Sequence, residues 1–514
     1  MAEGIWEVRT TYGPVAGRVA DGTGVFRGIP YAAPPVGPHR FGPPVPPEPW
    51  HDTLAADAFG PTPPRSTAGL FDVEASGEPV PGDGWLTVNV WAPRERSGPL
   101  PVMVWIHGGA FLRGSSAGTL YDGSAFARDG VVLVSLNYRL GVEGFGYIQG
   151  APAPANRGLL DQLFALQWVR DNIAGFGGDP GNVTVFGESA GAMSILALLS
   201  TGTDLFHKAI VQSGSASLGQ SVDDARLITA AVAEELGIDA GFDGFRTVDP
   251  GAVIEAQQRV HQLVVDTADA GRFGATTIAS CGMSFLPVVD GDLLAQAPID
   301  AIRSGAGSHV TLLLGTNTEE HRFFVAPYPG LIGVGAEAFK ARLAQYGVPG
   351  HAYDAYAAAD EKPYTRDTPA QVFAAVMTDR IFRIPSYRVA EARSAAAPTF
   401  VYEFGWRSPA TISTELPLGA AHIVEIPFVW DNLGTPGADG FIGTEPPAEL
   451  ARTMHGRWVE FARTGAPEGW PAYGPDRAVL AFAKHDTPGS EVVHDPRSGE
   501  RWLWEGVEFL PGLA

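Results

Sequence analysis

The residues with the clearest chemical potential lie in Gly187-Glu188-Ser189-Ala190-Gly191, a Gly-x-Ser-x-Gly pattern. A β-branched run, Val183–Phe186, precedes this pattern, and the helix-forming stretch Ala192–Leu199 follows it. A strand that turns sharply into a helix presents the central serine on a strained turn, and glycines leave room for such a turn. In a chain with 64 glycines the pattern alone carries little weight. With its strand and helix flanks, it predicts a nucleophile at Ser189.

A serine hydroxyl is a weak nucleophile at neutral pH, so Ser189 needs a base, and the base needs a carboxylate that orients it. On a strand-turn-helix scaffold of this kind the chain order is serine, acid, histidine. Glu320 is the predicted acid and Glu319 the second choice, because both follow the apolar run Thr311–Leu314, where the ends of parallel strands form active sites. A solvated acidic loop is the alternative interpretation of this pair.

His422 is the predicted base, since it lies after the acid in the turn-rich segment Leu418–Pro427. An isolated histidine is more often structural than catalytic, and spacing alone does not single out His422. The rival histidines beyond the acid are His321, His351, His455, His485 and His494.

Acyl transfer also requires donors for the oxyanion of its tetrahedral intermediate. The segment Trp105–Phe111 places two glycines directly after an apolar run, so the N–H groups of Gly109 and Ala110 are candidates, together with Ala190 at the start of a helix. A tight connection or a phosphate cradle is the alternative, but no Gly-Lys-Ser/Thr ending follows, which disfavours a P-loop.

Metal chemistry has one weak candidate, because His422 and Glu425 stand three residues apart. Pro427 argues against a helix that would place both on one face, and the chain has no His-Glu-x-x-His motif and no cysteine cluster. We therefore expect neither a metal nor another cofactor.

The composition, with 45% hydrophobic and 18% charged residues, is that of a folded globular protein. A net charge of -22 disfavours binding to nucleic acid or anionic membranes. The lone Cys281 has no disulfide partner in the chain, and we expect it to contribute to packing rather than to act as a nucleophile. Without a signal peptide or an apolar stretch of membrane-spanning length, we expect a cytoplasmic monomer or weak homo-oligomer that acts on a small molecule.

The elements that must position these residues read as an α/β sheet within one domain, residues 1–514. A helix is predicted over 159–173, ended by Phe176–Pro180, and Ala-rich helical insertions near 221–280 and 336–397 are expected to cap the sheet. Strands are predicted over 101–106, 131–136, 182–186, 309–314, 400–404 and 478–482.

The chain resembles the type B carboxylesterase family of α/β-hydrolases, from its N-terminal region to its last hundred residues. Phe176–Pro180 leading into Phe186–Gly191 is the most specific stretch. The other segments that carry the resemblance are Phe26–Phe41, Leu86–Trp91, Asn137–Gly141, Gly158–Gln162 and Phe461–Gly465.

The resemblance implies an α/β-hydrolase fold and a serine carboxylesterase that cleaves esters of small to medium apolar substrates through an acyl-enzyme. It assigns Ser189 as nucleophile, Glu320 as acid and His422 as base. The oxyanion positions it implies are Gly109, Ala110 and Ala190.

Three departures from the family pattern stand out. His321 follows Glu320 where the family usually has glycine, and Trp85 replaces the second cysteine of the family's N-terminal disulfide, which suits a cytoplasmic bacterial-type esterase. Ala75 stands near the position where cholinesterases carry a cation-binding tryptophan, which disfavours choline esters.

Two further functions stay open. The same triad could act on carbamates or amides or transfer the acyl group to an acceptor other than water, and a non-catalytic binding protein could share the fold. Ser213 is expected to support the site by hydrogen bonding rather than to act as a nucleophile. Apolar residues that could line a substrate pocket, or simply pack in the core, are Phe111, Phe285, Leu286, Phe323 and Phe324.

Overall fold

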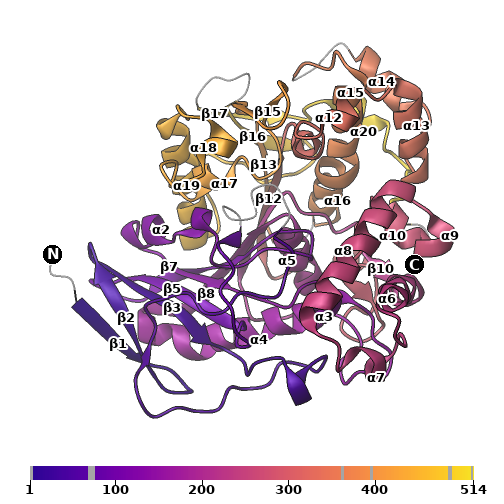
Figure 1. Cartoon of the computed structure of the whole chain (residues 1–514). Coiled ribbons are helices and arrows are strands. Elements are labelled where there is room, and N and C mark those ends of the chain that lie inside the picture. Colours follow the sequence, from indigo (N-terminus) through magenta and orange to yellow (C-terminus); the bar gives the residue numbers. More distant parts are fainter. Residues whose placement is uncertain are drawn as a thin grey trace.

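The computed structural model describes residues 4–67, 76–359, 364–393, 397–483, 489–510 and 513. Within these ranges a central sheet runs in the order β1-β2-β3-β5-β7-β6-β8-β9-β12-β13-β16-β17, with β4 paired to β2 (Figure 1). Its strands are β1 (Gly4–Arg9), β2 (Pro14–Ala20), β3 (Thr23–Pro30), β4 (Leu54–Ala55), β5 (Thr87–Pro93), β6 (Leu100–Ile106), β7 (Val132–Leu136), β8 (Gly178–Glu188), β9 (Lys208–Gln212), β12 (Thr311–Asn317), β13 (Thr399–Phe404), β16 (Ala478–Phe482) and β17 (Ser490–His494).

The strands from β7 to β16 along this order pair in parallel, whereas β1, β2, β3, β5 and β17 join antiparallel at the two edges. The predicted α/β class is therefore confirmed. Short two-stranded sheets lie outside the central one, formed by β10 (Gln220–Ser221) with β11 (Val288–Val289) and by β14 (Ser408–Thr411) with β15 (Pro417–Gly419).

Every predicted strand has a counterpart in the sheet, because each apolar run is buried on both sides. One boundary differs. The predicted helix terminator Phe176–Pro180 is partly strand, since β8 already begins at Gly178. Gly178 pairs with Leu100, the register then shifts, and regular pairing with β6 resumes at Val183.

Helices surround the sheet. The longer ones are α4 (Arg157–Asn172), α5 (Ala190–Ser200), α6 (Val222–Leu236), α8 (Pro250–Thr267), α13 (Ala336–Gln345), α15 (Pro369–Thr378), α16 (Ile384–Ala392) and α19 (Ala448–Thr464). The shorter ones are α2 (Ser124–Arg128), α3 (Gly141–Phe145), α7 (Phe242–Phe245), α9 (Ala270–Phe273), α10 (Ala275–Ala279), α11 (Pro298–Arg303), α12 (Pro329–Ile332), α14 (Ala352–Ala358), α17 (Ile426–Val429), α18 (Asp439–Ile442) and α20 (Ser498–Trp502).

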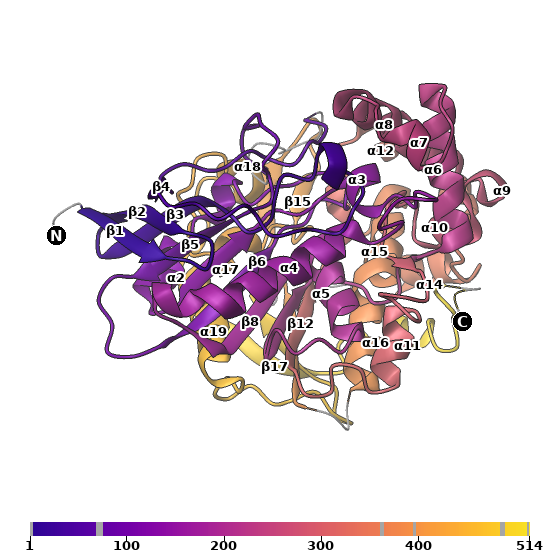
Figure 2. The same ribbon diagram turned by 90° about the horizontal axis from the view of Figure 1, so that it is seen from below.

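The two stretches expected to be helical insertions do form helices, α6 to α10 and α13 to α16. In Figure 1 helices α6 to α10 lie at the end of the molecule away from β1, and helices α13 to α16 lie beside this first group. Figure 2 shows α4 and α5 running along the strands of the sheet. No helix in the described ranges is both long and apolar enough to cross a membrane.

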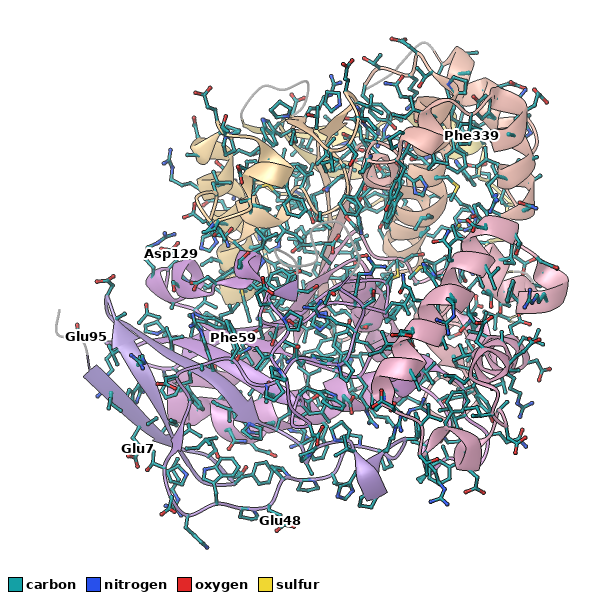
Figure 3. All side chains as sticks on the ribbon, in the orientation of Figure 1. Glu7, Glu48, Phe59, Glu95, Asp129 and Phe339 are labelled. Carbon is teal, nitrogen blue, oxygen red and sulfur yellow. The ribbon has the colours of Figure 1, made fainter. Side chains whose placement is uncertain are left out.

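The core lies on both faces of the sheet, as the alternation along β6 shows. Val102 and Val104 pack in one buried cluster, which also contains Ile195 of α5, whereas Met103 and Trp105 pack in a second. Successive side chains of a strand point to opposite faces, so one apolar run serves both clusters. Side chains fill the space between sheet and helices in Figure 3, and the labelled Glu7, Glu48 and Glu95 lie at the periphery, where all three are exposed.

A buried ion pair joins the segment after β7 to helix α4. The Arg139 guanidinium donates to both carboxylate oxygens of Asp161, from Nε at 2.8 Å and from Nη2 at 2.7 Å, and neither side chain is more than 1% exposed. Arg139 Nη1 also donates to the Gly42 carbonyl at 2.7 Å. The paired geometry satisfies two charges that would otherwise be costly to bury.

Candidate active site

Ser189 lies at the sharp turn between β8 and α5. Its backbone has φ 55° and ψ −124°, its N–H donates to the Gln212 carbonyl at 2.9 Å, and its own carbonyl accepts from Met193 N at 2.8 Å. A Cβ on Gly187 or Gly191 would lie 2.6 Å or 2.0 Å from the Ile106 carbonyl oxygen. The two glycines therefore permit the close approach of β6 and β8 that the strained turn requires.

His422 and Glu320 meet although 102 residues separate them in the chain. His422 Nδ1 lies 2.7 Å from Glu320 Oε2, and both side chains are almost completely buried. The second oxygen of Glu320 accepts from the Ser213 hydroxyl at 2.5 Å and from Asn317 N at 2.7 Å. The predicted hydrogen-bonding role of Ser213 is thus borne out, and Glu320 is fixed from three sides.

The other ring nitrogen of His422 faces a second carboxylate. Nε2 lies 3.0 Å from Glu188 Oε1, although the alignment is not that of a hydrogen bond, and Nε2 forms none with Ser189. Burial alone lowers the pKa of His422, but Glu188 and Glu320 reverse this and hold that pKa well above its ordinary value. The site therefore favours a positively charged imidazole.

Glu425, considered above as a metal partner of His422, has a different environment. One of its carboxyl oxygens accepts from Gln212 Nε2 at 3.0 Å, and the other accepts from Asn317 Nδ2 at 2.6 Å. Burial, together with the charges of Glu188 and Glu320, raises the pKa of Glu425 to about 8. The carboxyl group is therefore mostly neutral at pH 7.

The predicted oxyanion donors differ in exposure. Ser189, Gly109 and Ala110 are partly exposed, whereas the neighbouring residues His107, Glu188 and Ala190 are buried. None of the N–H groups of Gly109, Ala110 and Ala190 donates a hydrogen bond within the described part of the chain. Free donors beside an accessible hydroxyl are what an oxyanion hole requires.

Aromatic rings surround His422. The ring centroids of Phe324, Phe323 and Phe382 lie 5.5 Å, 6.2 Å and 4.8 Å from the imidazole. The first two belong to the short helix η4 (Glu320–Phe324), and Phe382 belongs to the π-helix η5 (Asp379–Arg383). Phe323 and Phe324 thus lie beside His422, and Phe324 is 39% exposed; their role in a substrate pocket stays a prediction.

The other predicted pocket residues are part of the packed core. Phe111 has no exposed surface and packs on Phe145 with ring centroids 4.6 Å apart. Phe285 and Leu286 are likewise buried in the same cluster. Their burial favours the alternative given above, that these three residues contribute to packing.

Glu319, the rival acid, and His321, the nearest rival base, do not form the contact that joins Glu320 and His422. Glu319 accepts from Arg322 at 2.7 Å and from Ala420 N at 3.0 Å, and it has no contact with His422. Burial lowers the pKa of His321 to about 3. His455 contacts the Val429 carbonyl and Asp129, and the His494 ring contacts the Asp476 carbonyl, while Ala75 and His485 lie outside the described residues.

Sequence reasoning missed the Glu188 contact, the role of Glu425 as a hydrogen-bond acceptor, and Phe382. Glu188 precedes Ser189 in the sequence, but the direction of its side chain depends on the backbone turn at Ser189. Phe382 had no local signal, since a π-helix places it against a histidine 40 positions later in the chain.

Comparison with known proteins gives a consistent result. A sequence model of the carboxylesterase family matches residues 6–497. The chain is 38% identical to para-nitrobenzyl esterase of Bacillus subtilis (strain 168), with 96% of this chain and 97% of the relative covered. It is 34% identical to phenmedipham hydrolase of Pseudarthrobacter oxydans, with 95% and 96% covered.

Solved structures agree with this relationship. A PNB esterase superposes with a TM-score of 0.83 at 36% identity, and a Geobacillus stearothermophilus carboxylesterase with 0.82 at 35%. In both cases 97% of this chain and 99% of the other are covered. The chain therefore belongs to the carboxylesterase family, with an α/β-hydrolase fold, and is a carboxylic ester hydrolase.

Proposed function

We propose that the chain hydrolyses carboxylic esters of small to medium apolar substrates through a Ser189–His422–Glu320 triad. The observation that carries the proposal is the 2.7 Å contact between His422 Nδ1 and Glu320 Oε2, close to the strained turn at Ser189. A buried carboxylate at Nδ1 orients the ring and leaves Nε2 to exchange protons with the nucleophile.

The reaction has two steps. Ser189 Oγ attacks the ester carbonyl carbon while its proton moves to His422 Nε2, and the N–H groups of Gly109, Ala110 and Ala190 stabilise the oxyanion. His422 then returns the proton to the departing alcohol. Water attacks the acyl-enzyme with His422 as base, which releases the acid and restores Ser189. This sequence requires the Ser189 hydroxyl to reach Nε2 in the substrate complex, as often happens only once substrate is bound.

Burst kinetics on p-nitrophenyl esters of increasing acyl length test this proposal. We expect a stoichiometric burst from the wild type and a loss of turnover on the order of 10⁵-fold or more in Ser189→Ala. Ser200→Ala, at the other end of α5, is the matched control and should keep full activity. An intact burst in Ser189→Ala would refute the assignment.

Phenmedipham is a second candidate substrate, and the name of a relative is the reason to test it. One relative is named phenmedipham hydrolase and matches almost the whole chain. We therefore propose phenmedipham, beside p-nitrobenzyl esters, as a substrate of the same triad. Comparison of kcat/KM for a p-nitrobenzyl ester and for phenmedipham distinguishes an enzyme that hydrolyses only the first from an enzyme that hydrolyses both.

We further propose that residues 1–514 form one catalytic domain, with the helices near 221–280 and 336–397 as insertions, acting in the cytoplasm as a monomer or weak homo-oligomer. The net charge of -22 supports the monomer or weak homo-oligomer, because it opposes close self-association. Light scattering over a concentration series and cell fractionation test the two parts.

A further inference from the structure

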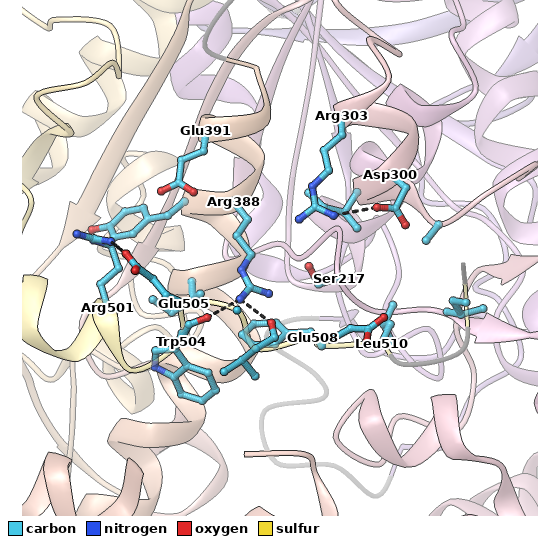
Figure 4. A pocket seen from close by; sticks show the side chains of 18 of the residues that line it. Ser217, Asp300, Arg303, Arg388, Glu391, Arg501, Trp504, Glu505, Glu508 and Leu510 are labelled. Atoms are coloured by element: carbon cyan, nitrogen blue, oxygen red, sulfur yellow. Dashed lines mark hydrogen bonds and ion pairs between the residues drawn. The ribbon is translucent and has the colours of Figure 1, made fainter. Parts of the chain in front are cut away.

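A cavity of about 470 Å³ lies between α11, α16 and the segment that follows α20 (Figure 4). Its lining contains none of the residues proposed for catalysis. The volume is within the range of small-molecule sites in proteins. The cavity is therefore a second place where a ligand of that size could be held.

Arginines and carboxylates line the cavity in equal number, but not all of them are paired. Arg303 pairs with Asp300 at 2.8 Å, Arg501 pairs with Glu505 at 3.1 Å, and Arg477 pairs with Glu391. Arg388 has no carboxylate within ion-pair distance among the described residues, and Glu508, which also lines the cavity, is exposed.

Arg388 is held in place by uncharged groups. Its Nη2 donates to the carbonyls of Trp504 and Val507, each at 2.8 Å, and its guanidinium carbon lies 4.0 Å from the centre of the Phe509 ring. Burial, with the charges of Arg303 and Arg380, lowers the pKa of Arg388 to about 10. The guanidinium is thus fixed and charged at pH 7. It has no ion-pair partner among the described residues, and the Glu391 charge acts on it only from beyond that distance.

A buried hydroxyl faces the same space. Ser217 is 4% exposed and lines the cavity, and its hydroxyl has no hydrogen-bond partner in the part of the chain that the structure describes. Figure 4 shows Arg388, Arg303 and Ser217 among the residues that line this cavity. A guanidinium and a hydroxyl that share an opening provide donors for one small anionic group.

Apolar side chains also line part of the cavity. Phe509 is 3% exposed, and Leu510 and Leu513 are each 8% exposed. Ile299 and Ile384, from α11 and α16, add to this surface. A ligand that fills the cavity would therefore bury a hydrocarbon part as well as an anionic head.

We propose that this cavity binds a monocarboxylate with an apolar tail, its carboxylate between Arg388 and Ser217 and its tail against Leu510 and Leu513. One guanidinium that has no ion pair with a described residue matches a single negative charge better than the two of a phosphate. The planar fork of arginine also suits a carboxylate.

Calorimetric titration of the full chain with octanoate tests the proposal, with 1-octanol as the probe of equal tail and no charge. We expect Arg388→Gln to weaken octanoate binding at least tenfold, and Ser217→Ala several-fold, with octanol binding unaffected. Glu508→Gln should tighten octanoate binding, since it removes a competing carboxylate. Arg226→Gln, on the exposed side of α6, is the matched control and should change nothing.

Octanoate bound in the active site is recognised by competitive inhibition of ester hydrolysis, which Arg388→Gln should leave unchanged. A crystal soaked with 8-bromooctanoate locates the ligand even if a variant does not fold, and we expect bromine in the cavity. Equal octanoate affinity in wild type and Arg388→Gln, bromine only elsewhere, or equally tight binding of inorganic phosphate would each overturn the proposal.

Discussion

Glu188 Oε1 lies 3.0 Å from His422 Nε2, so the imidazole has a carboxylate beside each of its nitrogens. Glu320 contacts the nitrogen that must stay fixed, and Glu188 contacts the nitrogen that must exchange protons with Ser189 in the proposed reaction. Both carboxylates raise the pKa of His422 against the opposing effect of burial. A protonated imidazole cannot act as a base, so in the proposed reaction the charges of Glu188 and Glu320 would raise the pH at which catalysis begins.

Glu188→Gln should therefore move the acid limb of the kcat/KM profile to lower pH. The substitution removes the charge at Nε2, which lowers the pKa of His422, so the neutral base persists at more acidic pH. The measurement is a pH profile on a p-nitrophenyl ester. Glu445→Gln, an exposed substitution, is the control, and an acid limb that stays in place in Glu188→Gln would contradict the electrostatic interpretation.

Ser213→Ala should lower kcat roughly 10- to 100-fold with little change in KM. The Ser213 hydroxyl donates to Glu320 at 2.5 Å, and a hydrogen bond to a charged group contributes about 1.5–3 kcal/mol. Losing it loosens the carboxylate that orients His422. Steady-state kinetics beside a thermal unfolding curve separate this effect from a folding defect. An unchanged kcat would show that Asn317 N alone holds Glu320.

Glu425→Gln should make stability less dependent on pH. The folded pKa of Glu425 is raised to about 8 from an ordinary value of 4.5, so its contribution to stability is present at low pH and is lost as pH rises through about 8. An amide cannot ionise and lacks this loss. The Asn317 Oδ1 atom has no partner in the structure and can accept the new N–H after a turn of the Asn317 amide.

Tm values of wild type and Glu425→Gln at about pH 5 and about pH 9 measure this effect. The difference, variant minus wild type, should grow with pH. A difference that stays constant would mean that Glu425 does not bind a proton on folding.

Arg139→Met should destabilise the fold by about 3–5 kcal/mol, because it leaves the Asp161 carboxylate buried without its partner. The matched control is Arg170→Met, since Arg170 pairs with Asp204 at 3.2 Å on the surface and exposed pairs contribute about 0–1 kcal/mol. Urea unfolding midpoints give both values. Equal shifts in the two variants would refute the argument from burial.

The sheet could be predicted from sequence because its strands are apolar runs buried on both faces, as in β6 and β7. The sharp turn at Ser189 could be predicted because it has a local pattern of glycines. The boundary at Gly178 could not, since it depends on pairing with Leu100, and a bulge in that pairing leaves no local signal. Long-range pairing also decided between Glu319 and Glu320, which are adjacent in the chain but face different partners.

The strained turn at Ser189 also bears on protein engineering. Its conformation depends on buried backbone contacts of β6, β8 and α5, whereas the rings around His422 come from η4 and η5. Saturation libraries at Phe323, Phe324 and Phe382 would reshape the surroundings of the imidazole and leave the backbone at Ser189 untouched. Laboratory evolution can thus vary the aromatic rings around His422 and keep the turn at Ser189 unchanged.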